Sequence, residues 1–344
     1  MKILNLIAVG LALAGFSVLN SHLATALAQG SLAPSGAPAP TMKSLDQIEP
    51  RTDVTRLSGD ASSLYVITRP GSYFLTTNIV GVAGKSAIRI DTNDVTLDLN
   101  GFTLIGLSGQ IAINTFTTSI NRIRIINGHL IGWSGGVDFI TAGASADVTL
   151  ENLQMVGAGG SFGYGAGVGP GAFISHCRFT GFNGSFGFGI AGQDRSVVDQ
   201  CLFENDYNGV ALNNNAIVTG CLVRNCANVG IQVLRSSTVR NNQVDSCANG
   251  IQCSADAVVT DNNCNFCSGS GIYASGAYNR VENNQANFNN IGLQTQGGTT
   301  NFIVRNIAHG NTNLNYFLNG SVVAGPTVTT VGTVTNHPWA NFSF

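Results

Sequence analysis

The sequence has few charges. Only 10% of its 344 residues are charged, and lysine occurs three times, at Lys2, Lys43 and Lys85. With a formal net charge of −2, the chain offers no basic surface for phosphates, so no nucleic-acid partner is expected. Disorder is excluded as well, because disordered chains combine high charge with low hydrophobicity, whereas 44% of these residues are hydrophobic.

The sequence also lacks runs of good helix formers and contains only one long apolar stretch. Glycine (43 residues) and asparagine (37 residues) are abundant, and both are poor in helix interiors. The apolar stretch, residues 3–18, follows Lys2 and precedes Ala26 and Ala28, so residues 1–28 are predicted to be a signal peptide cleaved before Gln29. Its polar interruptions leave it below the roughly 20 apolar residues of a membrane span. We therefore expect an exported protein, extracellular, on the cell surface or periplasmic, with no membrane span.

A repeat of about 21 residues organises most of the remaining chain. A glycine followed by an aliphatic residue returns at each repeat, and a second aliphatic column runs beside it. The aliphatic residues after glycine are Val137, Val168, Ile190, Val210, Ile231, Ile251, Ile272 and Leu293. The second column is Ile174, Val198, Val218, Val239, Val259, Val281 and Val304. Three positions after these lie Cys177, Cys201, Cys221, Asn242, Asn262, Asn284 and Ile307.

This period predicts a parallel β-helix, an all-β fold in which each repeat is one coil of three short strands. Leucine-rich repeats need a different residue frame, and helical repeats are longer. Within a coil, Ile231-Gln232-Val233 alternates apolar and polar residues, so the outer two residues point inward. Like residues stack about 4.8 Å apart. Asn242, Asn262 and Asn284 are predicted to form a ladder at a turn, where asparagine tolerates a left-handed backbone.

Four segments resemble bacterial secreted right-handed parallel β-helix proteins with the pectate-lyase-like fold. They are residues 69–75 (RPGSYFL), 95–102 (VTLDLNGF), 45–51 (LDQIEPR) and 336–342 (NHPWANF). The resemblance implies a single-stranded right-handed coil with caps at both ends, in proteins of mostly undetermined function. Trp339 is predicted to serve in the C-terminal cap, with sugar binding as the alternative. The expected organisation is a signal peptide (1–28), a flexible leader (29–42), an N-terminal cap (43–85), a β-helix of about ten coils (86–315) and a C-terminal cap (316–344).

Outward residues of successive coils indicate a ligand-binding flank. Gln232, Gln252, Tyr273 and Gln294 follow the glycine–aliphatic pairs of neighbouring coils. Amides can hydrogen-bond sugar hydroxyls, and a tyrosine ring can stack on a pyranose. The alternative is an amide ladder that only stabilises the sheet.

Catalysis finds weaker support in the sequence. Glycosidases need a pair of carboxylates, and lyases need carboxylates for calcium together with a base. The outward column has one acid, Asp138. A neighbouring turn carries Asp194, Arg195, Arg235 and Asp256, but its two aspartates are three coils apart, about 14 Å, beyond the roughly 9.5 Å of a catalytic pair.

The predicted function is therefore an exported β-helix protein that binds carbohydrate or another surface partner along its flank without catalysis. One alternative is a polysaccharide lyase or glycoside hydrolase, and another is a structural spacer of the envelope or matrix. No cofactor is expected, with calcium needed only by a lyase, and the oligomeric state stays open.

Eight cysteines in an exported chain first suggest disulfides. Their positions favour buried thiols instead, because two columns of three cannot pair completely within themselves. Cys264-x-x-Cys267 is a lone pair without a second one, and the histidines share no ligand spacing, so no metal site is predicted. The glycine-rich residues 157–171 are predicted to be a widened loop. The cysteine columns are Cys177, Cys201 and Cys221, and Cys226, Cys247 and Cys267.

Overall fold

A computed structural model describes residues 50–344, apart from 108, 141–144, 161, 297–299 and 334. The predicted signal peptide and leader lie outside the described residues, as does the start of the predicted N-terminal cap. The described part is all-β, with one short 3₁₀ helix, η1 (Val54–Arg56). No helix in that part is long and apolar enough to cross a membrane.

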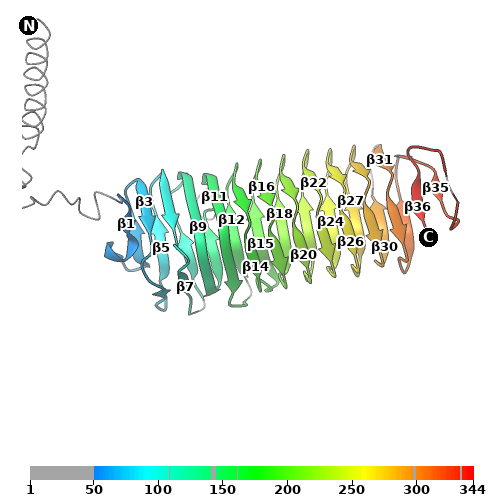
Figure 1. Cartoon of the computed structure of the whole chain (residues 1–344). Helices are drawn as coiled ribbons and strands as arrows, with labels where there is room; N and C mark the ends of the chain where they lie inside the picture. The colour runs from blue at the N-terminus through cyan, green and yellow to red at the C-terminus, as the bar shows by residue number, and fades with distance from the viewer. Residues whose placement is uncertain (1–49, 108, 141–144, 161, 297–299, 334) are drawn as a thin grey trace, which may run out of the picture. The chain divides into compact units, whose positions relative to one another are not determined.

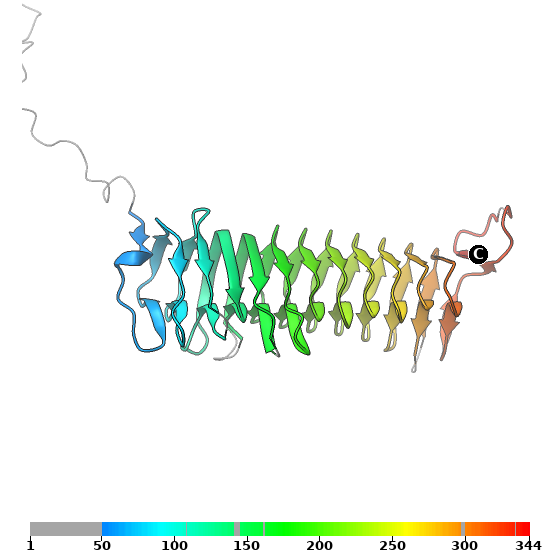
Figure 2. The ribbon, with the colours of Figure 1, turned by 90° about the horizontal axis from the view of Figure 1, so that it is seen from below.

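Residues 51–344 coil into a stack of three-stranded turns, in which every strand pairs in parallel with its counterpart in the next coil. Figure 1 shows this stack from β1 (blue) to β36 (red), and the view turned by 90° in Figure 2 shows the coils edge-on. The predicted all-β parallel β-helix is confirmed. One face is a separate 12-stranded sheet with one strand per coil, close to the expected number of coils.

The 12-stranded sheet is made of β2 (Ser63–Ile67), β5 (Ser86–Ile90), β8 (Ile111–Asn114), β10 (Gly135–Asp138), β12 (Phe162–Val168), β15 (Phe186–Gly192), β18 (Asn208–Leu212), β21 (Val229–Val233), β24 (Asn249–Cys253), β27 (Ser270–Ala274), β30 (Ile291–Thr295) and β33 (Leu314–Leu318).

The second face consists of β1 (Thr52–Asp53), β3 (Gly71–Phe74), β6 (Val95–Asp98), β13 (Phe173–Ser175), β16 (Val197–Asp199), β19 (Ile217–Thr219), β22 (Thr238–Arg240), β25 (Val258–Thr260), β28 (Arg280–Glu282), β31 (Asn301–Val304) and β34 (Val322–Ala324). The third face consists of β4 (Ile79–Val80), β7 (Thr103–Ile105), β14 (Arg178–Thr180), β17 (Leu202–Glu204), β20 (Leu222–Arg224), β23 (Gln243–Asp245), β26 (Asn263–Asn265), β29 (Gln285–Asn287), β32 (Ile307–His309), β35 (Thr327–Val328) and β36 (Asn341–Ser343). Two long strands, β9 (Asn121–Trp133) and β11 (Ala146–Gly157), pair on both faces and so join them into one 24-stranded sheet.

The recurring glycine is required by the close approach of successive coils. A Cβ on Gly165 would lie 2.5 Å from the carbonyl oxygen of Gly189, and one on Gly250 would lie 2.4 Å from that of Gly271. Real Cβ atoms do not approach so closely, so no other residue fits without backbone movement. The glycines with such a contact are Gly136, Gly165, Gly189, Gly209, Gly230, Gly250, Gly271 and Gly292.

Two details of the predicted register are wrong. Residues 162–168 form strand β12, not part of a widened loop, and Ala166 rather than Val168 pairs with Val137 and Ile190. The extra residues of this long repeat are divided between the connection from β10 to β11 and the connection from β11 to β12. In the coil that contains β31, Ile303 rather than Val304 continues the second aliphatic column. In both places several small or apolar neighbours offered more than one alignment.

The asparagine ladder lies at the turn between the second and third faces. Each backbone N–H donates to the side-chain oxygen of the asparagine one coil further on: Asn242 to Asn262 at 3.0 Å, Asn262 to Asn284 at 2.9 Å and Asn284 to Asn306 at 3.0 Å. These residues are buried. The left-handed backbone belongs to the residue before each of them, as at Asp261 (φ 60°), so the prediction was one residue off.

All eight cysteines are buried and free, as the register predicts. Cys177, Cys201 and Cys221 precede the asparagine ladder in the same column, and the thiol of Cys177 donates to the carbonyl oxygen of Ser175 at 3.2 Å. Cys226, Cys247 and Cys267 form the second column, at the turn between the third face and the 12-stranded sheet. Burial raises the pKa of both Cys221 and Cys267 to about 12, so these thiols stay protonated.

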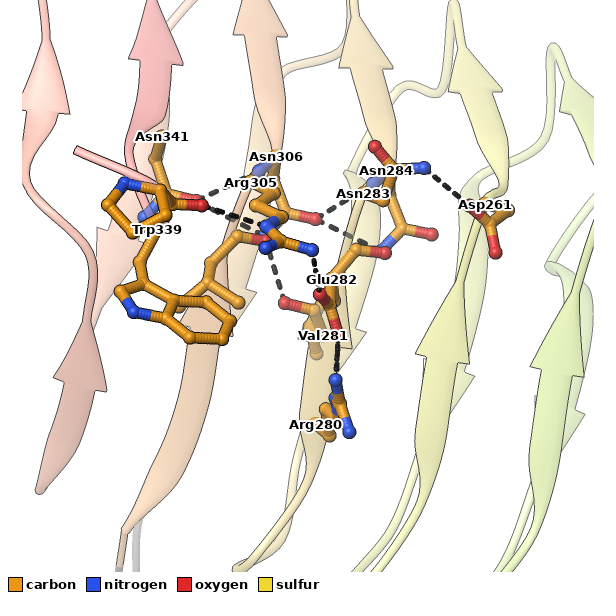
Figure 3. Close-up of polar contacts among 12 residues, drawn as sticks. Asp261, Arg280, Val281, Glu282, Asn283, Asn284, Arg305, Asn306, Trp339 and Asn341 are labelled. Atoms are coloured by element: carbon orange, nitrogen blue, oxygen red, sulfur yellow. Dashed lines mark hydrogen bonds and ion pairs between the residues drawn. The ribbon is translucent and has the colours of Figure 1, made fainter. Parts of the chain in front are cut away.

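The last residues complete the ladder (Figure 3). Asn341 accepts a hydrogen bond from the backbone N–H of Asn306 at 2.9 Å, as a further rung would. Arg305 donates to the carbonyl oxygen of Pro338 at 2.8 Å, pairs with Glu282 at 3.1 Å and lies 4.7 Å from the ring centroid of Trp339. The segment around the predicted closing motif is thereby fastened to the final coils.

Strand pairing continues across both predicted cap boundaries. β2 pairs with β5 across residue 85, and β33, which contains residue 315, pairs with β30. The division into a coil and two caps stays a proposal.

Candidate functional site

One column of outward residues runs along the 12-stranded sheet, and we call it the outer row. The strand register places four predicted binding residues on consecutive strands, Gln232 on β21, Gln252 on β24, Tyr273 on β27 and Gln294 on β30. The register defines the whole row as Val66, Arg89, Asn114, Asp138, Gly167, Ala191, Ala211, Gln232, Gln252, Tyr273, Gln294 and Phe317.

The C-terminal half of the outer row presents amide groups around one tyrosine. All four predicted side chains are half-buried, so each keeps part of its surface accessible to a ligand. The Gln294 side-chain oxygen accepts a hydrogen bond from the Ser270 hydroxyl, which orients its NH₂ group as a donor. This half of the row can donate and accept hydrogen bonds and can stack one ring.

The middle of the outer row is floored by small residues and walled by aromatic ones. Ala191 and Ala211 leave a groove of about 360 Å³, which Tyr164 and Phe188 line on one side and Gln232 borders. The two aromatic ring centroids are 5.8 Å apart. Sequence reasoning missed both rings, because the misplaced register of β12 hid their shared column. The signal was present, since Phe188 stands two residues before Ile190 of the aliphatic column.

A second hollow of about 310 Å³ lies on the other side of Tyr164 and is bordered by Asp138. Asp138 is 7% exposed, and its carboxylate accepts the backbone N–H of Ile140 at 3.1 Å. Asn114, its register neighbour on β8, is also buried, and its side-chain oxygen has no hydrogen-bond partner in the described structure. Asp138 is the one carboxylate in the outer row.

The charged turn residues are not assembled into a catalytic pair. Asp194 accepts hydrogen bonds from the backbone and side-chain nitrogens of Asn214 at 3.0 and 3.1 Å, which ties its carboxylate to the next coil. Arg195 is exposed and has a left-handed backbone. Arg235 and Asp256 form an exposed pair at 3.7 Å, of a kind that contributes little to stability. Asp194 and Asp256 are three coils apart in the backbone ladder of this turn.

Metal ligands are not gathered anywhere in the described residues: no group of three or more histidine, cysteine or acidic side chains is placed to hold an ion. The chemistry available on the outer row is therefore hydrogen bonding by amides, aromatic stacking, one enclosed carboxylate and, near the N-terminal end, the Arg89 guanidinium, which is paired with Asp60 and Asp91.

Comparison with protein families matches residues 110–257 to the model of the right-handed β-helix region. The matched segment is thus identified as a right-handed β-helix region, and the parallel coil of the structure extends over residues 51–344. No curated protein matches the chain significantly.

Solved structures with a similar fold have low sequence identity. The Dettilon tailspike protein gp208 is 14% identical with a TM-score of 0.48, over 82% of this β-helix protein and 60% of the tailspike chain, less than two thirds of its length. The A-module of the Azotobacter vinelandii mannuronan C-5 epimerase AlgE4 is 12% identical with a TM-score of 0.46, over 80% of this chain and 100% of the module. The periplasmic alginate epimerase AlgG is 11% identical with a TM-score of 0.40, over 87% of this chain and 81% of the epimerase chain.

Proposed function

We propose that the protein is exported and binds a polysaccharide along the outer row of its 12-stranded sheet without cleaving it. The observation that carries this proposal is the succession of Gln232, Gln252, Tyr273 and Gln294 on adjoining strands, next to a groove walled by Tyr164 and Phe188. Amides offer both donors and acceptors to hydroxyl groups, and aromatic rings offer apolar faces to pyranoses. A linear polymer suits a site that extends over several coils.

Binding without cleavage is supported by the distribution of carboxylates. Hydrolysis by a pair of carboxylates needs two of them within roughly 9.5 Å of each other, and the outer row holds Asp138 alone. The alternative function is a lyase or glycosidase. Asp138 would be its catalytic candidate, since this carboxylate borders the hollow beside Tyr164. The structural-spacer alternative needs no ligand at all.

The binding test uses native gels that contain a polysaccharide, run with the chain from Gln29 onward. The panel holds neutral polymers (laminarin, xyloglucan, galactomannan) and acidic ones (alginate, polygalacturonate). Gln252→Ala with Tyr273→Ala should weaken retardation about tenfold, the factor that corresponds to about 1.4 kcal/mol, because one stacking ring and one amide are removed. Gln154→Ala, on the third face, is the matched control and should bind normally. Full binding by the double variant would contradict the proposed site.

The catalytic alternative is tested with the same polymers and calcium by measuring new reducing ends. Hydrolysis and elimination both create them, so one assay covers both enzyme classes. We expect no release. Release that disappears in Asp138→Asn would establish the enzyme instead of the binding protein.

A further inference from the structure

Two phenylalanines occupy turn positions that favour glycine or asparagine. Phe266 and Phe288 follow β26 and β29, at the turn that leads into the 12-stranded sheet, with φ of 54° and 58°. Left-handed backbone is strained for a bulky side chain. Other coils fill the same position with smaller residues, Asn205, Asn225, Ser246 and Gly310.

Burial does not compensate for this strain. Phe266 is 57% exposed and Phe288 is 49% exposed, so neither ring lies in the core. The left-handed turn recurs in the neighbouring coils, so the fold needs the turn but not a bulky side chain in it, and strain of this kind is found mainly at functional sites. The two rings therefore require an explanation outside the folding of the coil.

The rings form a short stack that is closed at one end. Their centroids are 5.3 Å apart with planes 10° from parallel. Beyond Phe288, the His309 ring meets it edge-on at 5.4 Å, and Gly310 lies so close that a Cβ there would be 2.8 Å from the ring. At the opposite end, the preceding coil places only the small Ser246 beside Phe266. One face of Phe266 is thus open along the axis of the stack.

Polar residues directly precede the aromatic positions and Ser246 in their coils. The neighbouring strands of the third face carry Asn265 and Asn287, and the Asn265 side-chain oxygen accepts the backbone N–H of Asn287 at 3.3 Å. Asp245 is half-buried and directly precedes Ser246. An aromatic face bordered by hydroxyl, amide and carboxylate groups suits a ring with C–H groups on its face and hydroxyls on its edge.

We propose that Phe266 and Phe288 form a second sugar site, where a pyranose of a neutral polysaccharide stacks on the open face of Phe266. The negative ring face attracts the polarised C–H groups of a sugar. The Asp245 carboxylate disfavours an acidic sugar, because Arg224, its neighbour on β20, is already paired with Glu204 at 3.0 Å. This inference rests on the proposed polysaccharide binding and adds the class of polymer. The turn leads directly into β27, which carries Tyr273 of the outer row, so the site borders the same sheet.

A protein partner is a poorer match for these rings. Stable protein interfaces bury about 800 Å² on each partner, and two half-exposed phenylalanines provide far less, since a whole aromatic side chain buries about 150–250 Å². Their neighbours on the third face are amides rather than apolar residues.

The test uses Phe266→Asn, Phe288→Asn and the double variant, on the chain from Gln29 onward. Asparagine already stands at this position in two other coils, so these variants should fold with a Tm equal to or above that of the unaltered protein. Retardation by the neutral polymers of the panel should weaken about tenfold in the Phe266→Asn variant, because the stacking face is gone.

Tyr278→Asn is the matched control. Tyr278 is 62% exposed and has a φ of 60°, but it lies at the other turn, between the 12-stranded sheet and the second face. This variant relieves the same kind of strain and should bind normally. Unchanged neutral binding by the Phe266→Asn and double variants, with loss in the Gln252/Tyr273 variant, would overturn this second site and leave the outer row standing. Binding of acidic polymers alone would also overturn it, and binding of no polymer would overturn both proposals.

Discussion

Asp206 replaces an asparagine-like rung with an acid. Asp206 is buried at the turn position that Cys226 occupies one coil later. Its carboxylate accepts a hydrogen bond from the backbone N–H of Phe182 at 2.9 Å, just as the Asn289 side-chain oxygen accepts one from the backbone N–H of Cys267. In the asparagine rungs the side-chain nitrogen also donates to a strand carbonyl, and Asn289 bonds that of Cys264 at 3.0 Å. The other Asp206 oxygen has no partner in the described structure, so a proton on it would restore the missing donor.

Asp206 should make stability depend on pH. Burial raises its pKa from 3.8 to about 7, so the folded protein holds a proton that the unfolded chain releases above about pH 4. The free energy of unfolding should therefore fall as pH rises from about 4 to 7, by up to about 4 kcal/mol. Urea denaturation at several pH values measures this, and Asp206→Asn should flatten the profile. Asp256→Asn, at an exposed turn, is the control. An identical slope in the Asp206→Asn variant would contradict the assignment.

At the scale of the elements, the closing segment acts as the last rung of the asparagine ladder. Asn341→Ala removes the acceptor of the Asn306 amide, and an unsatisfied buried donor costs about 1–3 kcal/mol. The Asn306 amide should exchange its hydrogen faster, and Tm should fall. The exposed Asn313 provides a control substitution to alanine. Unchanged protection of Asn306 would show that the segment does not complete the ladder.

The elements were largely predictable from the sequence because a 21-residue period repeats the same contacts. The inward Val239, Val259 and Val281 and the outward glutamines follow from simple alternation. The predicted strand register was wrong where the repeat is weak, as in β12, because its glycines interrupt the alternation of apolar and polar residues. The proposed site was only half predictable. The outer row follows from spacing, whereas the ring contacts of Tyr164 and Phe266 depend on the exact register of neighbouring coils.

At the scale of the whole molecule, cohesion comes from stacked buried side chains rather than covalent links. All eight thiols are buried, and burial raises the pKa of Cys253 to about 12, which suppresses the reactive thiolate. A thiol reagent should label none of them in the folded protein and all eight in denaturant without reductant. A reducing agent should leave Tm nearly unchanged. Fewer than eight titratable thiols in denaturant would reveal disulfides.

The hydrogen bonds of the asparagine ladder all run in one direction, from each amide to an oxygen further along the chain. A coil emerging during synthesis or export therefore holds an unsatisfied donor until its successor arrives. The coils can assemble from the N-terminal end, but the ladder hydrogen bond of each new coil forms only when the next coil has packed on it. A chain shortened before Asn341 would keep such a donor permanently, on an open end shaped to accept another coil. Truncated copies should then join end to end.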